Sequence, residues 1–346
     1  MVVYTSRFFE TIKVVFFILR IIDVHENVTY NVDYKQHGGK MDLNTIYKED
    51  CITGMQSHIL DESIDLIVAD PPYFKVIGQK WDYMWRTEED YLEWSKLWFH
   101  EASRVLRIGG SFYLFGYFRM LARLLPLLEE EGIALKQQII LNKGMQAVSG
   151  RATKNYKMFP NVTESVLFLY KDPQPFAKKY LKDRQKELGI SAKEINEYLG
   201  VKSNGGGMWS IYTGNNVCKQ LPTEELWEKL SEILEFTYPY SKLAVTFNAQ
   251  LGYTDVWDDV NFYSEKPRYH PTQKPQKLLD RIIKASSNEG DIVLDPFMGG
   301  GSTAISCINN KRKFIGFELD ELYYNKSIDR IKDHNKTTQL SIFTDL

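Results

Sequence analysis

The chain has 346 residues, enough for one large α/β domain with an insert or for two domains. Its hydrophobic fraction of 43% and charged fraction of 25% are those of an ordinary globular protein. The formal net charge of −2 excludes a basic field over the whole surface, so any contact with nucleic acid must use a local patch.

The cysteines argue against a disulfide framework and against a metal site. They stand far apart, at Cys51, Cys218 and Cys307, and they form neither a C-x-x-C nor any other metal-ligand pattern. Such usage suits a reducing compartment. We therefore expect a cytoplasmic protein.

Residues 1–40 do not resemble part of an enzyme. Their apolar run, Val14–Leu19, is bracketed by Lys13 and Arg20 and is too short to cross a bilayer. No small-residue cleavage site follows it. We expect no membrane contact, and we interpret 1–40 as an upstream extension before an initiator at Met41.

The first chemically informative stretch is Asp70-Pro71-Pro72-Tyr73. It follows Ile64–Ala69, an apolar run with the length and composition of a buried strand. Each proline fixes its own φ and holds the preceding residue extended, so the chain leaves the strand in a stiff turn. That turn presents a carboxylate, a carbonyl and an aromatic ring, which suit a planar molecule with an exocyclic amine. Taken alone, the tetrapeptide fits an ordinary strand exit equally well.

The surrounding pattern predicts one half of an α/β sheet. Near the turn, Trp81 and Trp85 are expected to pack in the core rather than to stack on bases, and a turn is expected at Gly109-Gly110. The expected helices are Gly54–Ile59, Glu88–Leu106 and Tyr117–Glu131, and the expected strands are Thr45–Cys51, Ser111–Phe115, Gln138–Leu141 and Val166–Tyr170.

Residues 143–157 form a basic loop without acids. Lys143, Arg151, Lys154 and Lys157 could follow a phosphate backbone, and a solvated loop explains them equally well.

Residues 173–262 read as an insertion that opens with a basic helix. Ser191 and Glu194 then have capping-box spacing, and a turn at Leu199–Val201 gives the first part of a helix-turn-helix pattern. Gly205–Gly207 departs from that pattern, because a recognition helix should begin there. A further helix is expected at Thr223–Leu234. Candidate base or phosphate contacts are Lys202, Ser203, Asn204, Trp209, Ser210 and Tyr212.

A second motif lies near the C-terminus. Asp291–Asp295 reads as a buried strand that ends in an acid, followed by the glycines 299–301 and a helix that opens at Ser302. The glycines allow a ligand to approach the backbone N–H groups. Glu318 follows 23 positions after Asp295, which matches the acid that binds a ribose in nucleotide-binding α/β folds. Helices are expected at Lys277–Ser286 and Glu321–Ile331, with a frayed tail.

These motifs resemble, in order, those of the β class of amino-DNA methyltransferases. The matching elements are Asp50-Cys51, Asp70–Tyr73, the H-P-T-Q-K-P element His270–Pro275 and Asp295–Thr303. The resemblance implies a Rossmann-like methyltransferase sheet of circularly permuted order, with S-adenosylmethionine as cofactor. It also implies a division of the chain into a catalytic half (41–172), an inserted, mostly helical target recognition domain (173–262), a cofactor half (263–335) and a tail (336–346).

The same resemblance assigns roles to residues. Asp70 and the Pro71 carbonyl would bind the two amine N–H groups, and Tyr73 would stack on a flipped base. Pro72 would belong to the same catalytic turn. The cofactor-binding residues would be Glu318 at the ribose, Asp50 and Cys51 at the adenine end, Asp295, Phe297, Gly299 and Gly301 along the methionine, and Thr272 and Lys274 near its carboxylate.

The predicted function is site-specific methylation of adenine N6 in duplex DNA. N4-cytosine methylation needs the same geometry, but in this class Asp at position 70 leans toward adenine and Ser toward cytosine. A DNA-binding regulator with a silent methylase is a second alternative, although every matched motif position is retained. Methylation of protein or RNA is a weaker third. A homodimer and a cognate restriction endonuclease are the other partners considered.

Overall fold

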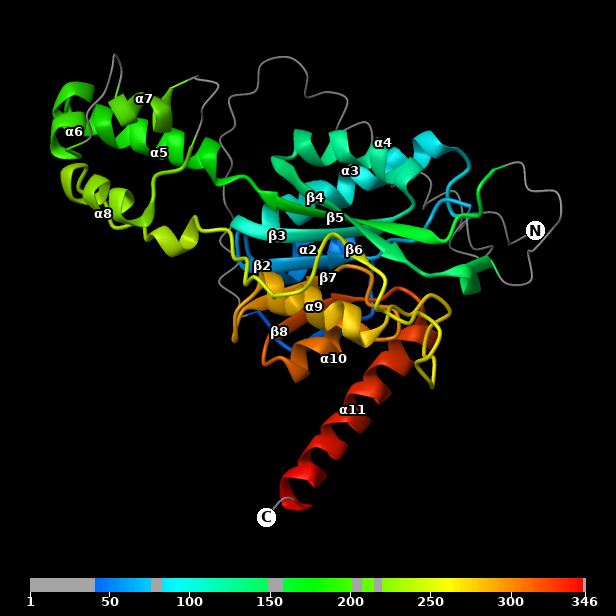
Figure 1. The fold of residues 1–346 in the computed structure, drawn as a ribbon. Helices are drawn as coiled ribbons and strands as arrows, with labels where there is room; N and C mark the ends of the chain where they lie inside the picture. The colour runs from blue at the N-terminus through cyan, green and yellow to red at the C-terminus, as the bar shows by residue number, and fades with distance from the viewer. Residues whose placement is uncertain (1–40, 76–82, 149–157, 201–206, 215–219, 345–346) are drawn as a thin grey trace, which may run out of the picture. The chain divides into compact units, whose positions relative to one another are not determined.

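Figure 1 shows the fold in the computed structural model, which describes residues 41–75, 83–148, 158–200, 207–214 and 220–344. Residues 41–346 form one compact unit. The expectation about an extension before Met41, and the one about Trp81, lie outside the described residues.

The described residues form one sheet of eight strands in the order β1-β8-β7-β2-β3-β5-β4-β6. The strands from β1 to β3 in this order run parallel, β5 is antiparallel to both β3 and β4, and β6 is parallel to β4. The strand bounds are β1 Thr45–Tyr47, β2 Ile64–Ala69, β3 Leu106–Gly116, β4 Ile133–Asn142, β5 Thr163–Lys171, β6 Val256–Trp257, β7 Ile292–Asp295 and β8 Lys313–Phe317. The predicted α/β sheet is confirmed.

Helices cover both faces of this sheet (Figure 1). One face packs against α2 (Cys51–His58), α3 (Glu88–Val105) and α4 (Phe118–Glu130). The other packs against α9 (Gln276–Ser286), α10 (Ser302–Asn309) and the first half of α11 (Glu321–Thr344), through Tyr324, Ile328 and Ile331. Successive side chains of β2 enter the two cores alternately, which explains why this strand is almost continuously apolar.

The glycines at 109 and 110 do not form the expected turn. They lie inside β3, where the pairing register with β2 shifts between Ile64 and Leu66. Gly109 has a φ of +71°, and a Cβ there would lie 2.4 Å from the Leu243 carbonyl oxygen. The glycine therefore allows a distant segment to approach the backbone of β3 closely, and it does not reverse the chain.

Other boundaries also differ. The strand expected at Thr45–Cys51 ends at Tyr47, because the Asp50 carboxylate accepts the Ile52 N–H (2.9 Å) and caps a helix that begins at Cys51. The strands β4 and β5 are longer than expected. Helix α11 continues to Thr344, since neither glycine nor proline interrupts it.

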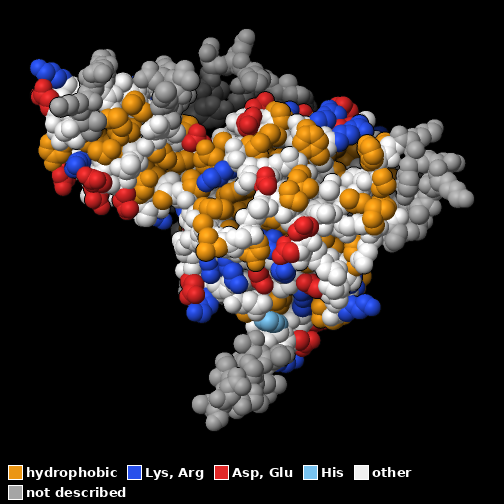
Figure 2. Space-filling model, viewed as in Figure 1, with side chains coloured by type: hydrophobic (Ala, Val, Ile, Leu, Met, Phe, Trp, Pro, Cys, Tyr) orange, Lys and Arg blue, Asp and Glu red, His pale blue; other side chains and the backbone are white. Residues whose placement is uncertain are grey.

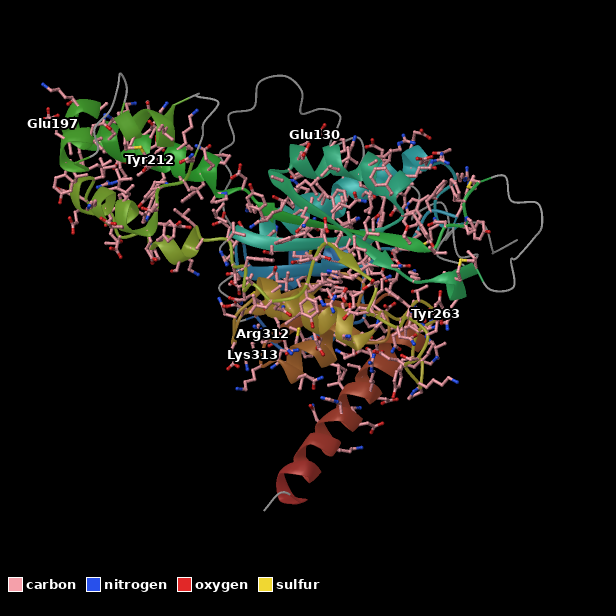
Figure 3. All side chains as sticks on the ribbon, viewed as in Figure 1. Glu130, Glu197, Tyr212, Tyr263, Arg312 and Lys313 are labelled. Atoms are coloured by element: carbon pink, nitrogen blue, oxygen red, sulfur yellow. The ribbon has the colours of Figure 1, made fainter. Side chains whose placement is uncertain are left out.

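The insertion contains its own hydrophobic core. Its helices are α5 (Pro173–Leu188), α6 (Ala192–Tyr198), α7 (Gly207–Thr213) and α8 (Glu224–Ile233). Two short 3₁₀ helices lie at Met145–Val148 (η2), between β4 and β5, and at Tyr240–Lys242 (η3), between α8 and β6. The capping box of Ser191 and Glu194 is confirmed. Trp209 and Tyr212 are buried in this core, so the expectation that they contact DNA is wrong. Figure 3 labels Tyr212 among the helices of the insertion.

Arg107 joins the sheet to the segment that returns from the insertion. Its guanidinium pairs with Asp65 at 2.8 Å and donates to the Ala244 carbonyl at 3.2 Å.

None of the described helices has the length and apolar character needed to cross a membrane. On the face shown in Figure 2, acidic and basic side chains are interspersed rather than segregated.

Candidate active site

The two motifs meet at the carboxyl ends of neighbouring strands. Parallel pairing of β2 with β7 places Ile67 beside Leu294. Asp295, the last residue of β7, and Asp70, the first residue after β2, therefore emerge at the same edge of the sheet. In open α/β sheets this edge is where ligands bind.

A cavity of about 430 Å³ opens at this edge. Its walls include most of the residues that the sequence singled out, namely Asp50, Cys51, Asp70, Pro71, Pro72, Tyr73, Thr272, Lys274, Asp295, Phe297, Gly299 and Glu318. Gly301 is not among the lining residues. It has a φ of +76° at the start of α10, and a Cβ there would lie 3.1 Å from Ser327, so its role is helix capping and close packing.

The glycine turn after β7 is held from two sides. The Gly299 N–H donates to the Glu318 carboxylate at 2.7 Å. From α11, Arg330 donates to the Gly300 carbonyl at 2.9 Å and to the Ser302 hydroxyl at 2.8 Å. The turn is thus fixed while its backbone borders the cavity, as a nucleoside-binding loop requires.

Two acids of the cofactor motif are buried. The Asp295 carboxylate accepts the Phe297 N–H at 2.9 Å and the Thr303 hydroxyl, and burial raises its pKa to about 7. Burial also raises the pKa of Glu318, although hydrogen bonds from the Asp320 and Gly299 N–H groups oppose the shift.

Aromatic side chains close the wall beside Phe297. Trp94 and Trp98 lie with ring centroids 5.9 and 5.1 Å from the Phe297 ring, and Trp85 lies 4.5 Å from Trp94. Trp85 is buried, which confirms the expectation that it packs in the core, and it also lines the cavity.

The H-P-T-Q-K-P element contributes a neutral histidine. Burial lowers the pKa of His270 to about 4, and the nearby Lys274 ammonium adds to the shift. The Thr272 N–H donates to His270 Nδ1 at 3.3 Å, and the Thr272 hydroxyl lies 2.9 Å from the same nitrogen. This contact orders the element where it borders the cavity.

The turn at Asp70–Tyr73 is held by hydrogen bonds to both oxygens of Asp70. The Tyr73 hydroxyl donates to Oδ1 at 2.7 Å, and the Lys274 ammonium donates to Oδ2 at 2.8 Å. Lys274, expected near the methionine carboxylate, therefore has its ammonium against the Asp70 carboxylate. Tyr73 is 9% exposed and meets Tyr117 edge-on at 5.4 Å, so its ring is a wall rather than an open platform.

Glu164, on β5, completes this cluster and belongs to none of the sequence motifs described above. Its buried carboxylate lies 2.7 Å from the Tyr73 hydroxyl oxygen, whose single proton it shares with Asp70, and it pairs with Lys274 at 3.0 Å and with Lys143. Lys143 is therefore engaged in an internal ion pair, which contradicts its assignment as a phosphate contact. The other candidates, Arg151, Lys154, Lys157, Lys202, Ser203 and Asn204, lie outside the described residues.

One sequence signal could have revealed Glu164. It stands two positions before Val166 and four before Phe168, and both are buried on the same face of the sheet. Because strand side chains alternate with a period of two, Glu164 is an acid on a buried face. Such an acid needs a partner, and it marks a candidate site.

The surroundings shift the pKa values of the two carboxyl groups in this cluster in opposite directions. Burial raises the pKa of Asp70, Lys274 opposes this, and the negative charge of Glu164 adds to it. Burial also disfavours ionised Glu164, but Lys274 and Lys143 outweigh it and lower the pKa to about 2. Burial works against the Lys274 ammonium, yet Asp70 and Glu164 raise its pKa. Asp70 is thus the more readily protonated of the two carboxylates.

Residues 64–329 match the model of the DNA methylase family of N6 and N4 methyltransferases. The chain belongs to this family. S-adenosylmethionine is accordingly the methyl donor of this DNA methylase. The chain is 28% identical over 295 residues to the DNA adenine methyltransferase YhdJ of Escherichia coli (strain K12), a match that covers 84% of this chain and 83% of that protein.

Two other similar proteins are also methyltransferases. The Type II methyltransferase M2.DpnII of Streptococcus pneumoniae is 26% identical over 295 residues, covering 81% of this chain and 87% of that protein. Among solved structures, the cytosine-N4-specific PvuII DNA methyltransferase superposes with a TM-score of 0.50 at 15% identity, covering 85% of this chain and 92% of that one. The structural likeness shows the fold of this DNA methylase, not its target base.

Proposed function

We propose that this DNA methylase transfers a methyl group to the N6 amine of an adenine extruded from duplex DNA. The observation that carries the proposal is the convergence of Asp70 with the glycine turn at 299 on one cavity. The identity of the base is supported by the acid at position 70 and by the relative named as an adenine methyltransferase.

The residues around the cavity fit S-adenosylmethionine. Its volume lies within the range of small-molecule sites, and the Glu318 carboxylate borders it at the end of β8, where a ribose acceptor is needed. We assign Asp50 and Cys51 to the adenine end, Asp295, Phe297 and Gly299 to the methionine side, and Thr272 to the neighbourhood of the methionine carboxylate. The cofactor supplies a methyl group already activated on a sulfonium, so no metal or covalent protein intermediate is needed.

Asp70 and the Pro71 carbonyl act on the amine. The lone pair of an exocyclic adenine amine is delocalised into the ring, which makes the nitrogen a poor nucleophile. Two acceptors fixed in place would bind its N–H groups and favour a pyramidal nitrogen. Because Tyr73 and Lys274 already hold the Asp70 carboxylate, the acceptor needs no reorganisation when the base arrives.

A second cavity offers space for the extruded base. It has a volume of about 670 Å³ and shares Tyr73 and Phe115 with the first cavity. Tyr117 and Asn161 are among its other walls, which provides an aromatic ring and an amide for a base. We propose that the base enters through this cavity and that its amine faces Asp70 past the Tyr73 ring.

The helices of the insertion are our candidate for sequence recognition, because they form a separate core beside the sheet. We retain a cytoplasmic location, a homodimer and a cognate restriction endonuclease as proposals. Sequencing of the DNA of cells that express the protein, with detection of modified bases, would give the target base and its context. N4-methylcytosine in place of N6-methyladenine would overturn the proposed target.

Replacing Asp70 tests the catalytic assignment. For Asp70→Ala we expect kcat to fall at least about 10²–10³-fold, because a fixed acceptor for the reacting amine is lost. Binding of S-adenosylmethionine, measured by calorimetry, should remain. Asp255→Ala, at an exposed position, is the control and should retain activity. Substantial activity of Asp70→Ala would remove Asp70 from the mechanism.

A further inference from the structure

Glu164 lies behind the catalytic turn and touches both groups that hold Asp70. Its side chain is 1% exposed. One oxygen, Oε1, lies 2.7 Å from the Tyr73 hydroxyl oxygen and 3.0 Å from the Lys274 ammonium. The Lys274 ammonium also donates to Asp70 Oδ2, and the Tyr73 hydroxyl, which has a single proton, lies within hydrogen-bond distance of both Glu164 and Asp70 Oδ1. A change in Glu164 therefore reaches Asp70 through these shared partners as well as through its own charge.

Burying these charged side chains costs free energy of folding, so we look for their role in the site rather than in stability. Removing ions from water carries a penalty of several kcal/mol each, and apolar residues often replace a buried ion pair without loss of stability. Here Lys274 is 9% exposed and bridges two carboxylates, and Lys143 pairs with Glu164 from the outer side. The cluster thus contains two acids and two lysines. Of these ion pairs, Glu164 makes one with each lysine, whereas Asp70 makes one with Lys274.

We propose that Glu164 is a positioning residue for methyl transfer. By drawing Lys274 and the Tyr73 hydroxyl toward itself, it orients the Asp70 carboxylate and keeps it a strong hydrogen-bond acceptor for the target amine. The inference rests on the proposed function and adds to it a residue that does not touch the substrate. Lys274 has the complementary role: it keeps Asp70 ionised despite its burial.

The charged and titratable groups that face Asp70 come from several elements. Tyr73 belongs to the same turn, Lys274 to the H-P-T-Q-K-P element, Glu164 to β5 and Asp295 to the end of β7. Behind them, Lys143 faces Glu164, His270 faces Lys274 and Glu318 faces Asp295. Since Glu164 and Lys274 act on Asp70 with opposite sign, their removal must shift its titration in opposite directions.

The pH dependence of kcat for DNA methylation tests this inference. Methyl transfer requires ionised Asp70, so the rate falls on the acid side. In Glu164→Gln the loss of a negative charge makes Asp70 easier to ionise, and we expect the acid limb to move to lower pH, with kcat reduced at least about tenfold because Asp70 is a weaker acceptor. In Lys274→Gln the acid limb should move to higher pH.

Controls separate positioning from loss of structure. Glu130→Gln, on the exposed side of α4 (Figure 3), should match the wild type. The affinity of Glu164→Gln for S-adenosylmethionine, measured by calorimetry, should stay within about threefold, since Glu164 does not line that cavity. If a single variant does not fold, Glu164→Gln/Lys274→Gln, which removes one charge of each sign, should show reduced kcat with an acid limb near that of the wild type.

The outcomes are distinguishable. Limbs that shift in the same direction or not at all, or a double variant with wild-type kcat, would overturn the role of Glu164. A wild-type protein that binds S-adenosylmethionine but methylates no DNA would instead overturn the proposed function. Methylation of cytosine N4 would change the target but leave the positioning inference intact, because that amine needs the same acceptor.

Discussion

At the scale of a residue, burial decides chemistry that the residue type alone does not. The Asp295 carboxyl is 6% exposed at the end of β7, and burial raises its pKa from an ordinary 3.8 to about 7. The fold thus favours its neutral form. The stability contributed by that form is fully present below about pH 4 and is lost as the pH rises through about 7.

Replacing Asp295 by asparagine should remove this pH dependence. Asp295→Asn is neutral at every pH, so its free energy of unfolding should rise relative to that of the wild type between pH 4 and 8. The pKa difference sets an upper limit on the order of 4 kcal/mol. Urea unfolding at pH 5, 6, 7 and 8 measures it, with the exposed Asp329→Asn as control. Parallel pH profiles for the wild type and Asp295→Asn would contradict the shift.

At the scale of an element, α11 stabilises the glycine turn across the sheet edge. Arg330 contacts the Gly300 carbonyl and the Ser302 hydroxyl, and its guanidinium stacks 4.8 Å from the centroid of the Tyr269 ring. Gly300 has little free space, because a Cβ there would lie 3.0 Å from Tyr269. The turn is therefore held between α11 and the segment that precedes α9.

Arg330→Gln should weaken cofactor binding more than catalysis. Hydrogen bonds of a charged group are worth about 1.5–3 kcal/mol, and a loosened turn would lose part of its backbone alignment. We expect Kd for S-adenosylmethionine to rise about tenfold or more while kcat at saturation changes little. Calorimetry and saturation kinetics measure both, with the exposed Lys332→Gln as the matched control on the same helix. An unchanged Kd would show that the turn is rigid without Arg330.

At the scale of the whole molecule, the core of the insertion is distinct from the two cores on the faces of the sheet, and Ile108 of β3 is the sheet residue that joins it. Trp227 on α8 is 1% exposed, and its indole N–H donates to the Tyr238 carbonyl at 2.8 Å. It packs with Leu181, Trp209 and Leu230 and lies outside both cores of the sheet. Damage to this core should stay in the insertion.

Trp227→Ala therefore separates DNA recognition from cofactor binding. Truncation of a buried tryptophan costs about 3–5 kcal/mol, which should open the insertion locally. Hydrogen exchange should increase in residues 173–243 and not in β2 or β7, and DNA affinity should fall while Kd for S-adenosylmethionine stays the same. Glu197→Ala, at an exposed position on α6 (Figure 3), is the control. Equal protection across the insertion, or lost cofactor binding, would show that the two cores are coupled.

Local chemistry explains why much of this protein follows from its sequence. The apolar runs of β2 and β7, the acids that end them, the glycine turn and the capping box of Ser191 each depend on neighbours a few residues away. Their order along the chain carries the family resemblance, and parallel pairing of two strands brings their carboxyl ends together by geometry alone.

The tertiary structure decided which charges meet. Lys274 and Asp70 are 204 positions apart, and Tyr73 and Glu164 are 91 apart, so no local pattern links them. Pairing of β4 with β5 brings Glu164 beside Lys143, and the segment that precedes α9 carries Lys274 to Asp70. Sequence periodicity assigns a side chain to a face, but the energy of a buried charge depends on partners that the folded chain alone supplies.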